Sequence, residues 1–328
     1  MNRELAIKVA DAVLFEGYML YPYRPSSLKN RQRWSFGILY PPDYSEVESR
    51  TERCAMRSEC LVNVTGEVSI EVQLRFLHLV TKQGTGENGQ PTERWDEGVQ
   101  RSVAVQTSCL EQSPQEASFN FAGSFETESL HDDTGQAERM LSRTQHEITG
   151  TLTVLSEKIS DTLMKLTIKV TNRTALPVYA RDREAALLRS FLSAHTIVTV
   201  TGGGFVSLLD PPDDLRETAA ACRNEGNFPV LVGDRESGER DMMLCSPIIL
   251  YDYPQIAPES NGDFFDATEM DEMLMLRIMT LTDKEKDEMR SADEHGRELL
   301  ERTEQSVREQ LMRTHGAIRS LRPVGGKQ

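Results

Sequence analysis

Apolar and polar residues alternate most strictly between Val68 and Phe76, where apolar side chains occupy every second position. A period of two places these side chains on one face of an extended chain, so it predicts a strand with one buried and one wet face. The same pattern returns from Met164 to Val170. Weaker copies contain Val103 and Val105, Phe119 and Phe121, and Ile148, Leu152 and Val154.

Polar, turn-rich segments separate these strands. Ser156 to Asp161 predicts a hairpin connection into the Met164 strand, and loops are predicted at residues 82–93, 111–118 and 128–138. Half-buried alternating strands joined by polar turns are typical of antiparallel sandwiches and barrels. We therefore expect an antiparallel β-sandwich-like body from residue 45 to residue 177.

Beyond Pro177 helical and extended signals mix. Residues 195–209 predict a hairpin whose turn is the triple glycine Gly202 to Gly204, because glycine allows the positive φ of a tight turn. Further short strands are predicted at residues 34–40, 228–233 and 242–247. Helices are predicted at residues 180–194 and 210–224, whereas residues 7–20 fit either a helix or a strand.

The C-terminal part reads as charged amphipathic helices, with Thr268 and Thr282 as candidate N-caps. Together the elements predict an α+β protein: an antiparallel β-sandwich-like body, a mixed α/β second region and C-terminal amphipathic helices. The predicted division is an N-terminal arm plus β-sandwich-like domain over residues 1–177, and a mixed α+β region ending in a charged helical tail over residues 178–328.

Charge and composition narrow the function classes. The formal net charge is -15, which argues against general nucleic-acid binding because that needs a basic surface. We expect a cytoplasmic protein, because the N-terminal residues lack a signal-peptide pattern and no apolar run reaches membrane-spanning length. The five cysteines form no CxxC pair and the six histidines form no HExxH motif, so we expect reduced thiols, no metal centre and no cofactor.

One histidine raises an enzymatic alternative. His195 follows Ser193, and Asp210 or Asp252 could complete a nucleophilic triad; Cys222 is a second candidate nucleophile. No GxSxG elbow accompanies them, and a lone histidine between a predicted helix and strand favours a structural role. The enzymatic hypothesis is therefore a hydrolase with a pocket near His195 and the segment from Ser246 to Glu259.

The segment from Tyr21 to Trp34 combines aromatic and basic residues without an acid. Stacking and phosphate contacts would suit RNA or a nucleotide, but an extended arm lying against the acidic remainder, or against a partner, is the favoured interpretation. Its candidate binding residues are Tyr21, Tyr23, Arg24, Arg31, Arg33 and Trp34.

The segment SPIILYDYPQIAPES, from Ser246 to Ser260, is stiffened by Pro254 and Pro258. We interpret it as a rigid strap that packs on the basic arm and sets Asp252 or Glu259 near Arg24, Arg31 or Arg33. Its candidate binding residues are Tyr251, Asp252, Tyr253, Gln255 and Glu259.

Several long runs, including RSFLSAHTIVTVTGGGFVSLLDPP and SPIILYDYPQIAPESNGDFFDATEM, resemble a family of bacterial proteins encoded in [NiFe]-hydrogenase gene clusters. The resemblance covers both ends of the chain and brings no catalytic residues with it. It implies a non-enzymatic accessory or scaffold protein in hydrogenase maturation or assembly, whose partner is a hydrogenase subunit or a maturation factor. No membrane association is expected, and nucleic acid is the lesser alternative.

Overall fold

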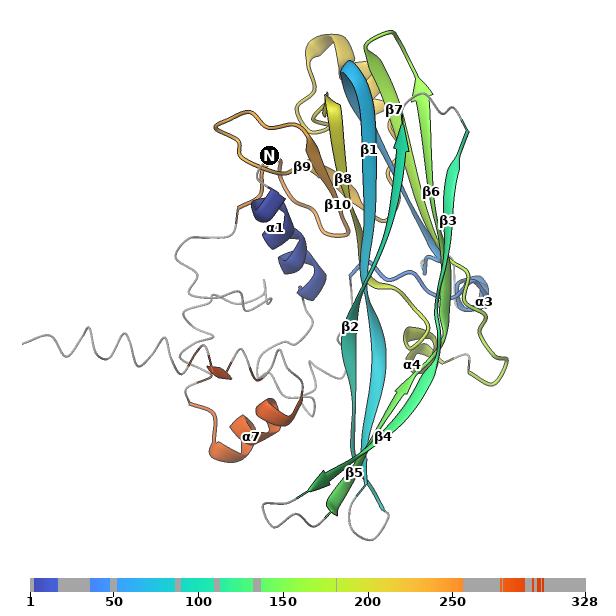
Figure 1. Cartoon of the computed structure of the whole chain (residues 1–328), viewed down its shortest axis with the longest axis vertical. Coiled ribbons are helices and arrows are strands. Elements are labelled where there is room, and N and C mark those ends of the chain that lie inside the picture. Colours follow the sequence, from blue (N-terminus) through green and yellow to red (C-terminus); the bar gives the residue numbers. More distant parts are fainter. Residues whose placement is uncertain are drawn as a thin grey trace, which may run out of the picture.

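The computed structural model describes residues 3–16, 36–47, 52–85, 90–108, 113–131, 137–180, 182–255, 278 and 280–292, together with residues 297, 300, 301 and 303. Antiparallel strands dominate it, and a few short helices lie at their margins (Figure 1). The predicted α+β class with a β-sandwich-like body is therefore confirmed.

One long strand, β1 (Ala55–Thr85), runs through the whole body. Along one edge it pairs first with β7 (Leu163–Asn172) and then with β2 (Pro91–Ser108). Along the other edge it pairs first with β8 (Leu192–Phe205) and then with β5 (Ala137–Gln145). Because its two halves have different neighbours, β1 belongs to both layers of the sandwich.

The remaining strands widen these layers. β6 (Ile148–Lys158) pairs with β7, and β3 (Gln115–Phe121) pairs with β6. On the opposite side, β10 (Met242–Ser246) pairs with β8, and β9 (Phe228–Leu231) pairs with β10. β4 (Ser124–His131) pairs with β5 alone among the described strands.

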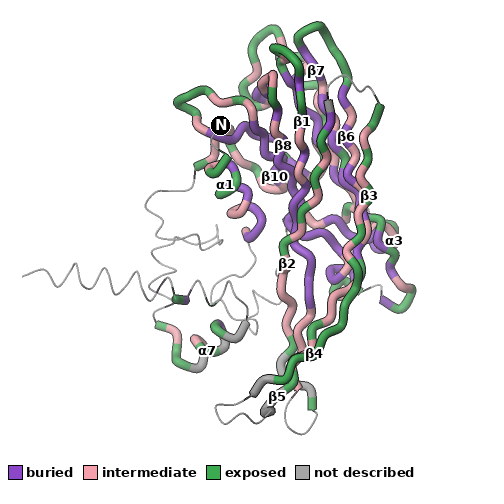
Figure 2. The backbone as a smooth tube through the Cα atoms, in the orientation of Figure 1, coloured by how far each residue is buried: buried purple, intermediate pink, exposed green. Residues whose placement is uncertain are grey.

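Buried residues of β1, β6, β7 and β8 form the main core cluster, and Figure 2 shows the buried stretches of these strands in purple. The apolar positions from Val68 to Phe76 are all buried, as the alternation predicts. The Phe76 ring stacks on that of Phe191 with centroids 4.6 Å apart, and Phe119 and Phe121 of β3 pack around it. Aromatic pairs of this kind add to the stabilisation from burial of their apolar area.

Helix α1 (Arg3–Phe15) covers the outer face of the layer that β8, β10 and β9 form. Residues 7–15, for which the sequence allows a helix or a strand, are therefore helical. Four apolar residues on one side of α1, from Ala6 to Val13, pack on Ile197 of β8 and on side chains of β9 and β10. The same helix buries Arg75, on the face of β1 that alternation predicts to be wet. A strand pattern read alone cannot show that a helix returns over its polar face.

The other helices are short: α3 (Pro42–Val47), α4 (Arg183–Leu187), the 3-10 turn η1 (Asp213–Leu215), α5 (Arg216–Ala220) and α7 (Asp283–Ala292). The helix predicted at residues 180–194 is shorter than expected, because Leu192 already begins β8. Thr282 caps α7: its hydroxyl accepts from the Glu285 N–H at 3.3 Å, and the Glu285 carboxylate accepts from the Thr282 N–H at 2.9 Å. This reciprocal capping box confirms Thr282 as an N-cap.

The hairpin predicted at residues 195–209 is wrong. The triple glycine lies within β8, where Gly203 pairs with Val64 and Thr201 pairs with Ser69. The four β1 residues between Val64 and Ser69 therefore bulge opposite Gly202. Gly202 has φ +77°, and a Cβ there would lie 2.0 Å from the Glu67 carbonyl oxygen. The glycine serves the close approach of a bulge and not a turn.

The loop predicted at residues 128–138 is wrong for its described residues, because β4 runs to His131 and β5 begins at Ala137; residues 132–136 lie outside the described residues. All the described side chains of β4 are exposed, so the strand shows no apolar alternation that a pattern search could find. The hairpin connection predicted from Ser156 to Asp161 is confirmed in place, since it joins β6 to β7, but it is shorter than predicted because β6 runs to Lys158. The division at residue 177 stays a prediction, although strands from both sides of it hydrogen-bond in one sheet.

No helix among the described residues is both long and apolar enough to cross a membrane.

The bulge predicts an asymmetric effect of two glycine substitutions. Gly202→Ala should lower the free energy of unfolding by about 2 kcal/mol or more, since alanine is strained at positive φ and its Cβ meets a carbonyl oxygen. Gly66→Ala, in the same bulge but with no heavy atom within 4 Å of the new Cβ, should change it by less than about 1 kcal/mol. Urea denaturation measures both, and equal losses would contradict this account of the bulge.

Candidate functional site

The strap keeps its place through Asp252. One oxygen of its carboxylate accepts the Ser207 hydroxyl, and the other accepts the Leu231 N–H at 2.8 Å. The next residue, Tyr253, donates its own backbone N–H to the Leu231 carbonyl at 2.7 Å. The strap thus binds the outer edge of β9, and the rigid-strap interpretation has a physical basis at these contacts.

Tyr253 fixes the strap a second time. Its backbone has φ +56°, and its hydroxyl donates to the Glu239 carbonyl at 2.8 Å. Burial raises the pKa of this phenol above its ordinary value, so the hydroxyl stays a hydrogen-bond donor. Tyr251 is 85% exposed and Gln255 is exposed, so these two candidate binding residues face solvent.

The partner expected for the strap lies outside the described residues. This applies to the whole predicted basic arm, with Tyr21, Tyr23, Arg24, Arg31, Arg33 and Trp34, and also to Glu259. Contact between the strap and that arm therefore stays a prediction. Asp252 already has a partner on each oxygen, in Ser207 and in Leu231.

His195 lies in the core with its side chain fully buried. Its Nδ1–H donates to the Ser193 carbonyl oxygen at 2.7 Å, so the Ser193 hydroxyl is not its partner there and Nε2 carries the lone pair. Asp252, proposed as a third triad member, bonds Ser207 and Leu231 instead. A general base needs access to a substrate proton, and this imidazole has none.

A paired cation lies beside His195. Its cross-strand neighbour on β1 is Arg75, whose guanidinium pairs with Asp11 of α1. Burial lowers the pKa of the His195 imidazole to about 4, and the Arg75 charge acts in the same direction. Buried His78 also has a pKa of about 4, through burial first and Arg101 second. Both rings are therefore neutral at neutral pH.

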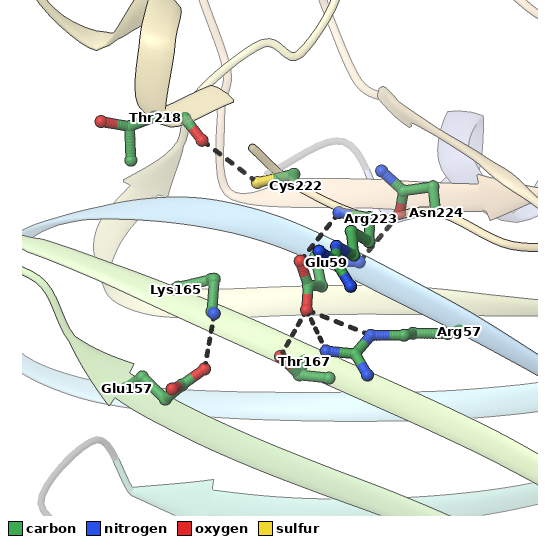
Figure 3. A network of polar contacts seen from close by, with 9 residues as sticks. All are labelled: Arg57, Glu59, Glu157, Lys165, Thr167, Thr218, Cys222, Arg223 and Asn224. Atoms are coloured by element: carbon green, nitrogen blue, oxygen red, sulfur yellow. Dashed lines mark hydrogen bonds and ion pairs between the residues drawn. The ribbon is translucent and has the colours of Figure 1, made fainter. Parts of the chain in front are cut away.

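A dense polar network surrounds Glu59 of β1, whose side chain is only 3% exposed (Figure 3). Its Oε1 accepts from Arg57, with Nε at 3.1 Å, and its Oε2 accepts the Arg223 N–H at 2.8 Å. The Glu59 backbone N–H donates to the Asn224 side chain at 2.8 Å. Arg57 and Glu225 exchange backbone hydrogen bonds in both directions.

These contacts tie residues 223–227 to the free edge of β1 before β8 begins to pair there. The Ser58 hydroxyl donates to the Asn227 side chain at 2.8 Å and extends the same contact. Burial alone would raise the pKa of the Glu59 carboxyl, but the Arg223 N–H and the Arg57 guanidinium outweigh it and hold the pKa below its usual range. Glu59 is therefore an ionised structural clamp whose acceptor sites are occupied.

Cys222 lies beside this network and is a poor nucleophile. Its thiol donates to the Thr218 carbonyl at 3.8 Å. Burial, followed by the Glu59 charge, raises the pKa of the thiol to about 11, so the reactive thiolate is scarce at neutral pH. The other described cysteines, Cys54, Cys60 and Cys245, are also free thiols. In the described part of the chain, no group of three or more His, Cys, Asp and Glu side chains could hold a metal ion.

One exposed feature is a projection that we call the β4–β5 arm, residues 124–131 and 137–145 (Figures 1 and 2). It continues the sheet where β5 pairs with the last residues of β1, from Val80 to Thr85. Phe125 is 69% exposed and Met140 is 49% exposed. The strand register places both on the same face of the arm.

Sequence patterns point to neither Glu59 nor the arm. Glu59 lies among polar and apolar residues without a motif, and its role depends on a loop more than 160 positions away. The signal that could have suggested the arm is the isolated Phe125 in a run of serine, threonine and glutamate. That signal is weak, since single exposed apolar residues are common.

Comparison with known proteins supplies no family. No protein-family model and no curated protein matches the chain. A solved structure of the Salmonella SPI-1 type III secretion injectisome secretin InvG, residues 176 to the end in the open gate state, aligns over 70% of this chain and 67% of that chain. The identity is 12% and the TM-score is 0.16, so this likeness says nothing about fold or function.

The clamp predicts a loss of stability when its charge is removed. Glu59→Gln should lower the free energy of unfolding by about 2 kcal/mol at pH 7, because it takes the charge from a buried acceptor of Arg57 and the Arg223 N–H. Glu157→Gln, which breaks the more exposed pair with Lys165, should cost less than about 1 kcal/mol.

The pH dependence follows from the lowered pKa. The contribution of Glu59 is fully present above the pKa of an unfolded glutamate and is lost as pH falls through the lower folded value. The gap between wild type and Glu59→Gln should therefore narrow in acid, as followed by urea denaturation from pH 7 downward. A gap that is constant with pH would contradict the clamp.

His195 predicts a second acid effect with its own window. Its folded pKa of about 4 lies below the ordinary value near 6.5, so the unfolded chain binds more protons between them and stability falls as pH drops through that range. His195→Asn, which keeps a donor near the Nδ1 position, should reduce the slope of unfolding free energy against pH by up to about 1.4 kcal/mol per unit. An unchanged slope between pH 6 and 5 would show that this imidazole is protonated in the folded state.

Proposed function

We propose that this protein is a non-enzymatic accessory or scaffold protein that binds other proteins, and that it acts in the cytoplasm in [NiFe]-hydrogenase maturation or assembly. The observation that carries the binding role is the β4–β5 arm, which exposes Phe125 and Met140 on one face. Exposed apolar side chains on one face of a strand pair give a partner an apolar contact surface, and these two lie four register positions apart along the arm. The hydrogenase connection rests on the resemblance of the longer sequence runs.

The hydrolase alternative has less support. It needs an accessible base near the strap, but His195 is fully buried and Asp252 is occupied by Ser207 and Leu231. Nucleotide or RNA binding would depend on the predicted basic arm, residues 21–34, and the charge of -15 weighs against it.

The test is co-purification with the tagged full-length protein from its own host, after cross-linking. We expect a hydrogenase subunit or maturation factor, and we expect Phe125→Ser with Met140→Ser to reduce its recovery at least about tenfold, as for contact residues at the centre of an interface. Val178→Ser with Tyr179→Ser is the matched control, because these residues are 78% and 88% exposed outside the arm.

Two outcomes would contradict the proposal. One is that no partner protein is recovered above the untagged sample. The other is that the control pair reduces recovery as much as the pair on the β4–β5 arm does. That result would show that the partner is held by non-specific contacts with exposed apolar side chains.

A further inference from the structure

We propose that β4 is a docking edge, to which an extended segment of a partner protein carrying lysine or arginine at alternate positions adds as a further antiparallel strand. This inference rests on the proposed binding function and names how the partner is held. Strand addition gives affinity through backbone hydrogen bonds and specificity through alternate side chains.

The edge itself is open. β4 pairs with β5 from Ser124 opposite Gln145 to His131 opposite Ala137, and no other strand in the described part of the chain pairs with it. Residues 122–129 are all exposed. The backbone groups on the outer side of such a strand are therefore available to a further strand.

The opposite end of the same sheet is treated differently. There the strap covers β9, since the Asp252 carboxylate and the Tyr253 N–H take up both backbone groups of Leu231. Proteins commonly protect the edges of their sheets by such coverings. β2 and β3 also have one edge without a paired strand in the described part of the chain, but only β4 has all of its described side chains exposed, and this contrast favours β4 as the edge left for a partner.

Charge on β4 defines the partner. Glu126 and Glu128 share one face, and the only described cation between them is Arg143 of β5, which lies opposite Glu126 and pairs with Glu128 at 3.5 Å. The described side chains thus set one cation against two carboxylates on this face, and opposite charges on paired strands attract. The other face carries Phe125 and Met140, which favours apolar residues at the positions between the basic ones.

A second copy of this chain fits poorly. Suppose that two β4 strands pair about a two-fold axis perpendicular to the sheet. Each face of the sheet then stays on its own side, so a residue can only lie opposite one whose side chain is on the same face of β4. The two registers with the greatest overlap set Glu126 opposite Glu128, or Glu128 opposite its own copy. Like charges placed directly opposite are destabilising, so β4 is protected against pairing with itself.

The test uses a fluorescein-labelled ten-residue peptide of alternating lysine and valine with the full-length protein at physiological ionic strength. Binding should weaken by about tenfold when Glu126→Lys and Glu128→Lys are combined, because each change replaces an attraction with a repulsion. Asp213→Lys with Glu236→Lys makes the same change in net charge at exposed sites outside the arm and should weaken binding less than about threefold.

Two further measurements separate strand addition from charge attraction alone. A peptide N-methylated at alternate residues cannot supply one row of hydrogen bonds and should lose binding. Bound peptide should slow amide hydrogen exchange in residues 124–131 of the protein. The inference is overturned if the methylated peptide binds equally well, if exchange in β4 is unchanged, or if both charge variants lose affinity equally.

Failure here is distinguishable from failure of the proposed function. If the co-purified partner is retained by the Glu126→Lys and Glu128→Lys variant but lost on Phe125→Ser with Met140→Ser, the scaffold role stands and strand addition does not. In the absence of peptide, amide hydrogen exchange in β4 could also become slower as the protein concentration rises. That result would show self-association and overturn the choice of partner.

Discussion

The structure depends on the backbone pairing of β1 along both of its edges, which the bulge at residues 65–68 interrupts. This strand pairs with β7 and β2 on one side and with β8 and β5 on the other, and it thereby holds the two layers of the sandwich in one hydrogen-bonded unit. Where no strand covers its first residues, the Glu59 clamp brings residues 223–227 to that edge. Much of the remaining structure either fills the space beside β1 or covers an edge of the sheet that extends from it.

This arrangement explains why the charged groups of the interior are structural. Glu59 is ionised because its acceptors are filled, whereas His195 is neutral because it is buried beside Arg75. The acceptor sites of Glu59 are occupied, and the lone pair on His195 Nε2 lies in the core, where a substrate has no access. The exposed β4–β5 arm is attached to the last residues of β1, because β5 pairs with residues 80–85 of that strand. The strand that organises the core therefore also supports the proposed binding edge, which lies at its other end.

Sequence patterns predict those strands of the fold that bury one face and expose the other. The alternation from Val68 to Phe76 and from Met164 to Val170 identifies strands that bury their apolar face in the core. The triple glycine misleads, because a glycine needed at a β-bulge and a glycine needed at a turn look alike in sequence. β4 escapes prediction for the opposite reason: both of its faces are wet, so no periodicity remains. The Glu59 clamp depends on Arg223, a contact fixed only by tertiary structure.

The most direct test of the central claim is amide hydrogen exchange of the free protein, resolved by residue. Residues 69–75 of β1, which pair with β2 along one edge and with β8 along the other, should exchange only through global unfolding and therefore most slowly. Alternate amides of β4, on its open side, should exchange within the fastest class of strand residues. Equal protection of β1 and β4 would contradict both the organising role of β1 and the open edge of β4.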